Sequence, residues 1–414
     1  MNQRALPLAG VKVVELGQLL AGPFAGTLLA YFGAEVIKVE PPGGDPIRGW
    51  RTLDDTGTSF WWRSLGRNKR SLTLDLKSDA GRELAARLID DSDVLIENFR
   101  PGTLENWGLG PERFKESNPG LIYTRISGYG QDGPYADKPG YASVCEGIGG
   151  LRYVNGFPGE RPVRPNLSLG DTVAGLHAAL GIALALLERH SSKQGQVVDV
   201  ALFESVFNLL EAVIPEFDGA GEIRQPAGST VTGIVPTNTY RCADGKYVII
   251  GGNGDSIFKR LMVTAERPDL AEDPRLAKNP GRVENEAEID GAIEAWCATL
   301  PRRAGKAGSE PGALRPDLQR RRHDGGPALP GARPVPAGGD QRRAAENPGN
   351  PAAPGRHPRR HPLARRRRRL RHRIGGTRRA WLVRGRIPAP ESRGCLRRLN
   401  SPATAGRAVG RGCP

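Results

Sequence analysis

Histidine is scarce in the first 300 residues of this 414-residue chain, which contain only His177 and His190. This scarcity argues against Ser-His-Asp and Cys-His catalysis and against His-rich metal sites, because each of these needs an imidazole. The five cysteines are far apart and form no C-x-x-C pair, so neither a zinc site nor a disulfide framework is expected. The sequence therefore predicts chemistry without a metal, in a reducing cytoplasm.

Fingerprints for nucleotides and membranes are also missing. There is no G-x-G-x-x-G after the first apolar run and no G-x-x-x-x-G-K-S/T, so the dinucleotide-binding and P-loop classes lose their support. The start of the chain does not resemble a signal peptide. The most apolar stretch, 173–187, falls short of the roughly 18 to 20 residues that a membrane span needs, which predicts a buried helix and no membrane partner.

Charge is distributed unevenly along the chain. Residues 1–300 carry 31 Lys and Arg against 39 Asp and Glu, whereas 301–414 carry 29 against 6. The second segment contains 28 arginines but only one lysine, and it lacks hydrophobic periodicity. Such a segment cannot bury enough apolar surface to offset its ordering entropy, so we expect 301–414 to be a disordered Arg/Pro/Gly-rich tail.

This tail has two consequences for function. An arginine-rich disordered segment is expected to bind nucleic acid only nonspecifically, through phosphates. The abrupt change also suggests a slipped reading frame in a G+C-rich gene. An inactive product with a scrambled C-terminus therefore stays open as an alternative to an enzyme.

Before residue 213, apolar strand-like runs alternate with segments of helical periodicity. Strands are expected at 11–16, 35–40, 93–97, 121–126 and 196–201, and helices at 19–32, 79–90, 171–189 and 201–213. Consecutive strands joined through helices pair in parallel by right-handed crossovers. We therefore predict the α/β class, with a Rossmann-like, doubly wound large domain over 1–213.

A smaller α+β domain is expected after it. Residues 214–235 have the Gly, Pro, Ser and Thr content of a linker, and a hairpin is expected around Asp244-Gly245. Helices at 256–264 and 284–300 would complete this region. We therefore divide the rest of the chain into a linker and small domain over 214–300 and the tail over 301–414.

Asp171 is the carboxylate that stands out, because it follows a glycine and precedes a long apolar helical segment. Aspartate is a favoured N-cap residue, so this position could serve structure alone. A carboxylate at a helix N-terminus is also expected to be held ionised by the helix dipole, which suits a carboxylate nucleophile. A structural role and a catalytic role are compatible for Asp171.

Four segments in order resemble the family III CoA-transferases, the formyl-CoA and carnitine CoA-transferase group: PLAGVKVVELGQLLAGPFAGTLLAYFGAEVIKVEPPGGD (7–45), NKRSLTLDLK (68–77), LIENFRPGTLENWGLG (95–110) and the segment around Asp171. The resemblance implies a large Rossmann-like domain, a smaller domain and an interlocked homodimer. It implies transfer of coenzyme A from an acyl-CoA donor to a carboxylic acid acceptor, through an aspartyl-CoA thioester on Asp171. It implies no cofactor beyond coenzyme A, which is a co-substrate.

The resemblance also implies site residues. The family contacts to coenzyme A fall on Leu74, Asp75, Lys77, Asn98, Phe99, Arg100, Lys138 and Tyr141. A mobile glycine loop that shields the aspartyl intermediate falls on Gly251, Gly252, Asn253 and Gly254. The chain departs from the family pattern at Leu20, Pro41, Asn106 and Ala142, which affects the expected substrate and the affinity for coenzyme A.

One alternative lies within the same family. The acyl-CoA racemase branch uses a histidine in a G-H-D segment, which here reads Gly140-Tyr141-Ala142. Tyrosine cannot replace imidazole as a base near pH 7, so the transferase is favoured. Arg161 and Arg164 precede Asp171 and could hold a second carboxylate, which makes a small dicarboxylate a reasonable substrate.

Overall fold

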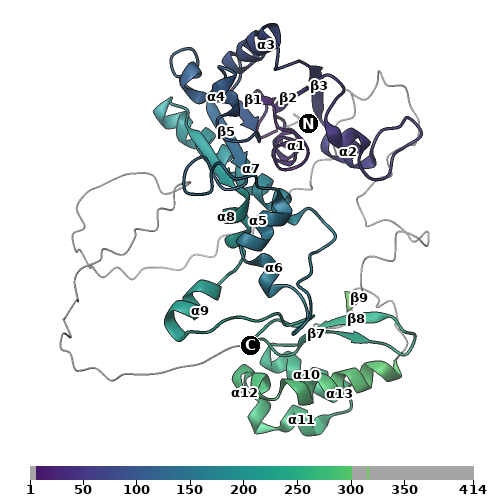
Figure 1. Ribbon diagram of the computed structural model, residues 1–414. Coiled ribbons are helices and arrows are strands. Elements are labelled where there is room, and N and C mark those ends of the chain that lie inside the picture. The colour runs from purple at the N-terminus through teal and green to yellow at the C-terminus, as the bar shows by residue number, and fades with distance from the viewer. Residues whose placement is uncertain (1–5, 301–314, 317–414) are drawn as a thin grey trace, which may run out of the picture. The chain divides into compact units, whose positions relative to one another are not determined.

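The computed structural model describes residues 6–300 and 315–316 (Figure 1). The predicted disorder of the tail and its nonspecific binding of nucleic acid fall on residues outside these ranges, apart from a two-residue strand. The strands are β1 (Lys12–Glu15), β2 (Glu35–Glu40), β3 (Lys69–Thr73), β4 (Val94–Glu97), β5 (Ile122–Ser127), β6 (Val197–Ala201), β7 (Thr237–Arg241), β8 (Tyr247–Gly251) and β9 (Arg315–Pro316). The α-helices are α1 (Ala21–Tyr31), α2 (Phe60–Leu65), α3 (Asp79–Asp90), α4 (Thr103–Asn106), α5 (Ala142–Ile148), α6 (Leu151–Val154), α7 (Leu169–Ser192), α8 (Leu202–Phe207), α9 (Val213–Ala220), α10 (Asp255–Thr264), α11 (Pro268–Glu272), α12 (Asn279–Glu284) and α13 (Glu286–Thr299), with short 3-10 turns η1 (Pro46–Gly49), η2 (Pro111–Phe114) and η3 (Pro274–Leu276).

Six strands form one parallel sheet in the order β3-β2-β1-β4-β5-β6. This order is that of the doubly wound α/β fold, in which the chain reverses direction across the sheet beside the first strand. β1 lies at the reversal, between β2 and β4. The predicted α/β class and parallel sheet are confirmed.

Helices cover both faces of the sheet because successive strand residues point to opposite sides. Val13 and Ile96 belong to the core shared with α1 and α7, whereas Val14 and Leu95 belong to the core shared with α3 and α4. Figure 1 shows α3 and α4 beside these strands. The sheet is therefore the middle layer of three.

Helix α7 is the longest described helix. By length and apolarity it is the one described helix that could cross a membrane. Ala174, Ala178 and Ile182 are fully buried in the core with the sheet and α1. This packing is that of a core helix in an α/β layer, as the sequence predicted.

A second sheet follows in the chain, with β8 between β7 and β9 and both pairs antiparallel. The hairpin predicted around Asp244-Gly245 is present. Its core contains Tyr240, Met262 and Ile293, from β7, α10 and α13. The predicted division at residues 213 and 300 stays a prediction.

Several elements differ from their predicted extents. The helix expected over 201–213 ends at Phe207, and α9 lies within the segment expected to be a linker. Strand β3 was not predicted, because its sequence KRSLT lies at an exposed sheet edge and lacks an apolar face. The strand β9 lies in the segment that the sequence predicted to be disordered.

Candidate active site

The carboxyl ends of the parallel strands meet at one edge of the sheet, where ligands bind in open α/β sheets. The connections after β1, β3, β4 and β5 all leave from this edge. Leu74, Asp75 and Lys77 follow β3, and Asn98, Phe99 and Arg100 follow β4. Lys138 and Tyr141 lie in the connection after β5. The fold therefore brings the predicted coenzyme A contacts of the large domain to one edge.

Asp171 lies in the first turn of α7, the helix that follows the connection after β5. The N-cap is Ser168, whose carbonyl accepts hydrogen bonds from the backbone N–H and the hydroxyl of Thr172. The structural role that the sequence offered for Asp171, that of N-cap, therefore falls to Ser168. Asp171 is the third residue of the helix, within its first turn.

Close packing fixes the start of α7 against two other helices. A Cβ atom at Gly175 would lie 2.8 Å from the carbonyl oxygen of Ala21, so the backbone of α7 packs closely against the backbone at the start of α1. A Cβ atom at Gly170 would lie 3.3 Å from both Cβ of Ala142 and Cγ of Glu146. The first turns of α7, which carry Asp171, are thus packed between the start of α1 and the helix α5.

Burial raises the pKa of Asp171 to about 6, the negative charge of Glu146 adds to the rise, and Arg164 opposes it. The direction is opposite to the one expected from the helix dipole alone, because desolvation disfavours the charged form. At neutral pH the group is still mainly ionised. Asp171 is therefore a carboxylate that is more basic than usual and available as a nucleophile.

Glu146 is a fully buried carboxylate on α5 that the sequence did not single out. Its Oε1 accepts a hydrogen bond from the N–H of Gly170 at 3.2 Å, and its Oε2 accepts one from Nε of Arg152 at 3.0 Å. Arg164 lies 3.5 Å from Oε1. Glu146 thus ties α5 to the start of α7 and places a negative charge beside Asp171.

Two other reactive side chains near α7 are unsuited to nucleophilic catalysis. Burial raises the pKa of Cys145 to about 11, and the charge of Asp171 adds to the rise, so the thiol stays protonated at neutral pH. His177 contacts the carbonyl of Val173 through Nδ1 and the amide of Asn208 through Nε2. Both imidazole nitrogens are therefore used within the fold.

The loop between β1 and α1 is held by Asn98. The Asn98 Oδ1 accepts a hydrogen bond from the N–H of Gln18 at 2.7 Å, and its Nδ2 donates to the carbonyl of Gln18 at 2.8 Å. A Cβ atom at Gly17 would lie 3.1 Å from this Oδ1, so the close approach favours glycine. Asn98, predicted as a coenzyme A contact, has its side-chain amide engaged with this loop.

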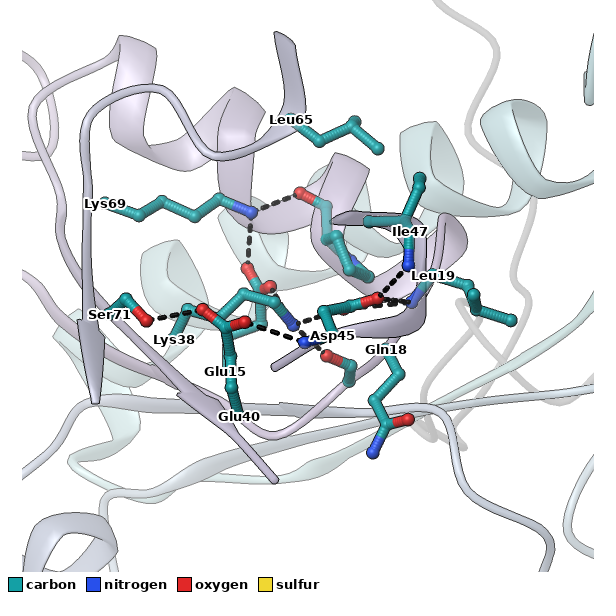
Figure 2. Close-up of polar contacts among 12 residues, drawn as sticks. Glu15, Gln18, Leu19, Lys38, Glu40, Asp45, Ile47, Leu65, Lys69 and Ser71 are labelled. Atoms are coloured by element: carbon teal, nitrogen blue, oxygen red, sulfur yellow. Dashed lines mark hydrogen bonds and ion pairs between the residues drawn. The ribbon is translucent and has the colours of Figure 1, made fainter. Parts of the chain in front are cut away.

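A buried charge cluster lies beneath the same loop (Figure 2). Lys38 is fully buried, and its Nζ lies 3.2 Å from Glu15 and 3.0 Å from Asp45. It also donates to the carbonyl of Gly17, while Asp45 accepts from the N–H of Leu19. Side chains from β1, β2 and the loop after β2 therefore fix the backbone that leads to Leu20.

The other predicted coenzyme A contacts present different surfaces. Asp75 and Lys77 are exposed, and the ring of Phe99 packs edge-on against Trp107. The Lys138 ammonium lies 3.7 Å from the ring centroid of Tyr135, and Tyr141 is 73% exposed. A cation and an exposed aromatic ring are suited to phosphate and adenine. Their role as coenzyme A contacts stays a prediction.

The predicted glycine loop belongs to the unit of the second sheet. Gly251 ends β8, and Gly254 is the N-cap of α10. The carbonyl of Asn253 accepts a hydrogen bond from Nη2 of the buried Arg282 at 2.7 Å, and a Cβ atom at Gly252 would lie 2.6 Å from Leu261. The predicted mobility of this loop is not tested by these contacts.

Known proteins are similar to this chain in sequence and fold. Residues 8–307 match the family model described as CoA-transferase family III. The chain is 50% identical over 291 residues to succinyl-CoA--D-citramalate CoA-transferase of Chloroflexus aurantiacus, covering 70% of this chain and 72% of that protein. It is 36% identical over 315 residues to formyl-CoA:oxalate CoA-transferase of Streptomyces avermitilis, covering 71% and 76%.

A crystal structure gives the same result. The structure of a CAIB/BAIF family protein from Brucella suis superposes with a TM-score of 0.64 at 36% identity, covering 72% of this chain and 80% of that one. The family match and these relatives therefore define the class of this α/β protein as a CoA-transferase. The chain belongs to CoA-transferase family III, and coenzyme A is its co-substrate.

Proposed function

We propose that this protein transfers coenzyme A from a dicarboxylic acyl-CoA, such as succinyl-CoA, to a second small dicarboxylic acid, by way of an aspartyl-CoA thioester on Asp171. The observation that carries the proposal is the buried, unusually basic carboxylate of Asp171 at the start of α7. The relatives named for succinyl-CoA, citramalate, and the pair succinate and glutarate support the dicarboxylate class.

The first half of the reaction loads the protein. The Asp171 carboxylate attacks the thioester carbonyl of the donor, the C–S bond breaks, and a mixed anhydride forms as coenzyme A leaves as a thiolate. The thiolate then attacks the aspartyl carbonyl carbon, and the bond between this carbon and the bridging anhydride oxygen breaks. The donor acid leaves as its carboxylate, and the aspartyl-CoA thioester remains.

The second half repeats these steps in reverse with the acceptor. The acceptor carboxylate attacks the aspartyl-CoA carbonyl, coenzyme A thiolate leaves, and the thiolate attacks the acceptor side of the new anhydride. Asp171 is regenerated as a carboxylate. The cycle consumes and releases no net proton, so it requires basicity at Asp171 rather than a separate general acid.

Substitution of the nucleophile tests this proposal. Asp171→Asn should reduce transfer from succinyl-CoA to a dicarboxylate by at least about 10³-fold, because the carboxylate that carries the acyl group is lost. Steady-state transfer rates measured by mass spectrometry would show it, with the exposed Asp218→Asn as the matched control. Full activity in Asp171→Asn would contradict the proposal.

The oligomeric state and the cellular location complete the proposal. Leu176, Leu180 and Leu187 of α7 are 50%, 56% and 70% exposed, and their spacing places them along one side of the helix. Exposed apolar stripes of this kind mark interaction surfaces. We infer a homodimer in which this stripe is covered by the second copy, in the cytoplasm, with no cofactor beyond coenzyme A.

A further inference from the structure

A cavity of about 380 Å³ lies next to the catalytic helix, within the size range of small-molecule sites. Its lining comes from two segments that are far apart in the sequence: Trp50, Arg51, Trp61, Arg164, Asn166, Leu167 and Ser168. Ser168 is the N-cap of α7, so the cavity begins within one helical turn of Asp171. Asp171 is not itself a lining residue, and it lies three positions further along the helix.

We propose that this cavity binds the second, non-reacting carboxylate of the dicarboxylic substrate, with Arg51 as its main anchor and Arg164 as its second. The inference rests on the proposed transferase function and adds to it the residues that select the substrate class.

Arg51 has no carboxylate partner among the described residues. Four arginines lie in the segment between β2 and β3, and two of them, Arg51 and Arg67, form no ion pair there; Arg67 instead donates to the carbonyl of Ser64. Arg48 pairs with Glu40 at 2.6 Å, and Arg63 pairs with Asp54 at 2.6 Å. Within residues 6–300, no carboxylate of the chain pairs with Arg51, whose guanidinium lies 3.7 Å above the ring of Trp61. A positive charge is thus presented to the cavity without being neutralised by the chain.

The backbone and the side chain of Arg51 are both held in place. Its φ angle is 61°, in the left-handed region that a residue with a Cβ atom seldom occupies. The surrounding loop is braced, because Asp54 accepts hydrogen bonds from the N–H groups of Thr56 and Thr58. Stacking on Trp61 further orients the planar guanidinium. Such a preorganised fork matches the geometry of a carboxylate.

Charge balance at the other wall also favours a bound carboxylate. Arg164 lies 3.5 Å from Oε1 of Glu146, donates to the carbonyl of Leu167 at 2.9 Å and lowers the pKa of Asp171, so it is a partly neutralised, second anchor. Glu146 and Asp171 already place two carboxylates in this region. A further carboxylate on the substrate would be repelled unless cations faced it, and the two guanidiniums provide them.

A phosphate of coenzyme A is a poorer occupant. The pantetheine arm separates the phosphates of coenzyme A from the thioester, whereas this cavity adjoins the residue that attacks the thioester. The tryptophan faces of Trp50 and Trp61 also suit the methylene chain of a short diacid.

The test compares succinyl-CoA with butyryl-CoA, which have acyl chains of equal carbon number but differ in the terminal carboxylate. In the full-length chain, Arg51→Gln should lower kcat/KM for succinyl-CoA by roughly 10- to 100-fold, the usual result of losing a charge-assisted hydrogen bond. The value for butyryl-CoA should stay the same. Arg51→Lys should have a kcat/KM for succinyl-CoA between those of the wild type and Arg51→Gln, because lysine keeps the charge but not the planar guanidinium. Arg164→Gln should lower the ratio of kcat/KM for succinyl-CoA to that for butyryl-CoA less than Arg51→Gln does, because Arg51 is the main anchor.

Arg267→Gln is the matched control, since Arg267 pairs with Asp269 at the surface, in the region of the second sheet. An unchanged ratio of the two donors in Arg51→Gln would overturn the inference. If the wild-type chain labels Asp171 with neither donor, the proposed transferase function fails instead.

Calorimetry tests ligand binding in the cavity independently of catalysis. The wild-type chain should bind glutarate at least tenfold more tightly than it binds butyrate. It should also bind glutarate at least tenfold more tightly than the Arg51→Gln variant does. No glutarate binding, or equal binding by wild type and variant, would overturn the inference.

Discussion

At the scale of single residues, the basicity of Asp171 depends on neighbours that are distant in sequence. Burial and the charge of Glu146 raise its pKa to about 6, although the start of a helix favours a negative charge. A more basic carboxylate is a better nucleophile as long as it stays ionised. The site therefore combines reactivity with ionisation at neutral pH.

This pKa predicts the pH dependence of the reaction. Because the attacking form is the carboxylate, kcat/KM for succinyl-CoA should be constant above pH 7 and should fall as the pH drops through about 6. Glu146→Gln removes a negative charge next to Asp171, so it should move this acidic limb to lower pH.

Rate profiles between pH 4.5 and 8 would measure both effects, with Glu188→Gln at the far, exposed end of α7 as the control. A limb that stays in place in Glu146→Gln would contradict the assigned cause of the shift.

The sequence singled out Asp171 as the nucleophile, which stays a prediction, but it did not show the environment of this carboxylate. Asp171 could be selected because it precedes an apolar helix and lies in a segment that resembles a family motif. Glu146 could not be selected, because it lies 25 positions earlier in the sequence and only the packing of α5 against Gly170 brings it near. Arg51 was missed for the same reason.

At the scale of elements, the buried Lys38 cluster links the strands to the loop that precedes α1. Lys38 on β2 joins Glu15 of β1 and Asp45 of the next turn, and it also holds the carbonyl of Gly17 (Figure 2). Lys69 of β3 adds a second buried pair with Glu15 at 2.7 Å. These contacts join β1, β2 and β3 at the active-site edge of the sheet.

Removal of this lysine should therefore destabilise the fold. Lys38→Met leaves the buried carboxylate of Asp45 without a cationic partner and leaves Glu15 with Lys69 alone, so the free energy of unfolding should fall by about 3–5 kcal/mol. Urea unfolding followed by circular dichroism would measure it. Lys12→Met is the matched control, because Lys12 pairs with Asp91 at the surface and should change stability little. Equal stability of the two variants would contradict the assignment.

Elements with clear periodicity were predicted well. The strand β2 and the helix α3 begin and end at the predicted residues, since β-branched alternation and helical apolar spacing are strong local signals. The edge strand β3 and the short helices α5 and α6 were not predicted. They are only four to seven residues long, too short to show a period, and their conformation depends on neighbouring elements.

At the scale of the whole molecule, the family match and the composition change at nearly the same place. The match to the family model ends at residue 307, and the arginine-rich composition begins near residue 300. The agreement supports the hypothesis of a slipped reading frame. Resequencing of the gene should reveal a single-base correction that restores periodic α/β sequence after this point. The absence of any such correction would contradict the hypothesis.

The exposed stripe on α7 predicts self-association. Leu180→Glu places a charge in the middle of the stripe, so it should convert a dimer into a monomer while the helix core at Ala178 and Ile182 stays buried. Light scattering after size-exclusion chromatography would measure the mass. Glu188→Ala is the control, because it removes a charge outside the stripe. An unchanged mass in Leu180→Glu would show that the stripe is not the dimer contact.

The most direct test of the central claim is to trap the aspartyl-CoA thioester on Asp171. The full-length protein is incubated with succinyl-CoA and then with hydroxylamine, which converts an aspartyl thioester into a hydroxamate, and the peptides are analysed by mass spectrometry. The hydroxamate should appear on Asp171, only when succinyl-CoA is present, and not in Asp171→Asn. An unmodified Asp171 in a chain that still transfers coenzyme A, or a hydroxamate at another residue, would contradict the account.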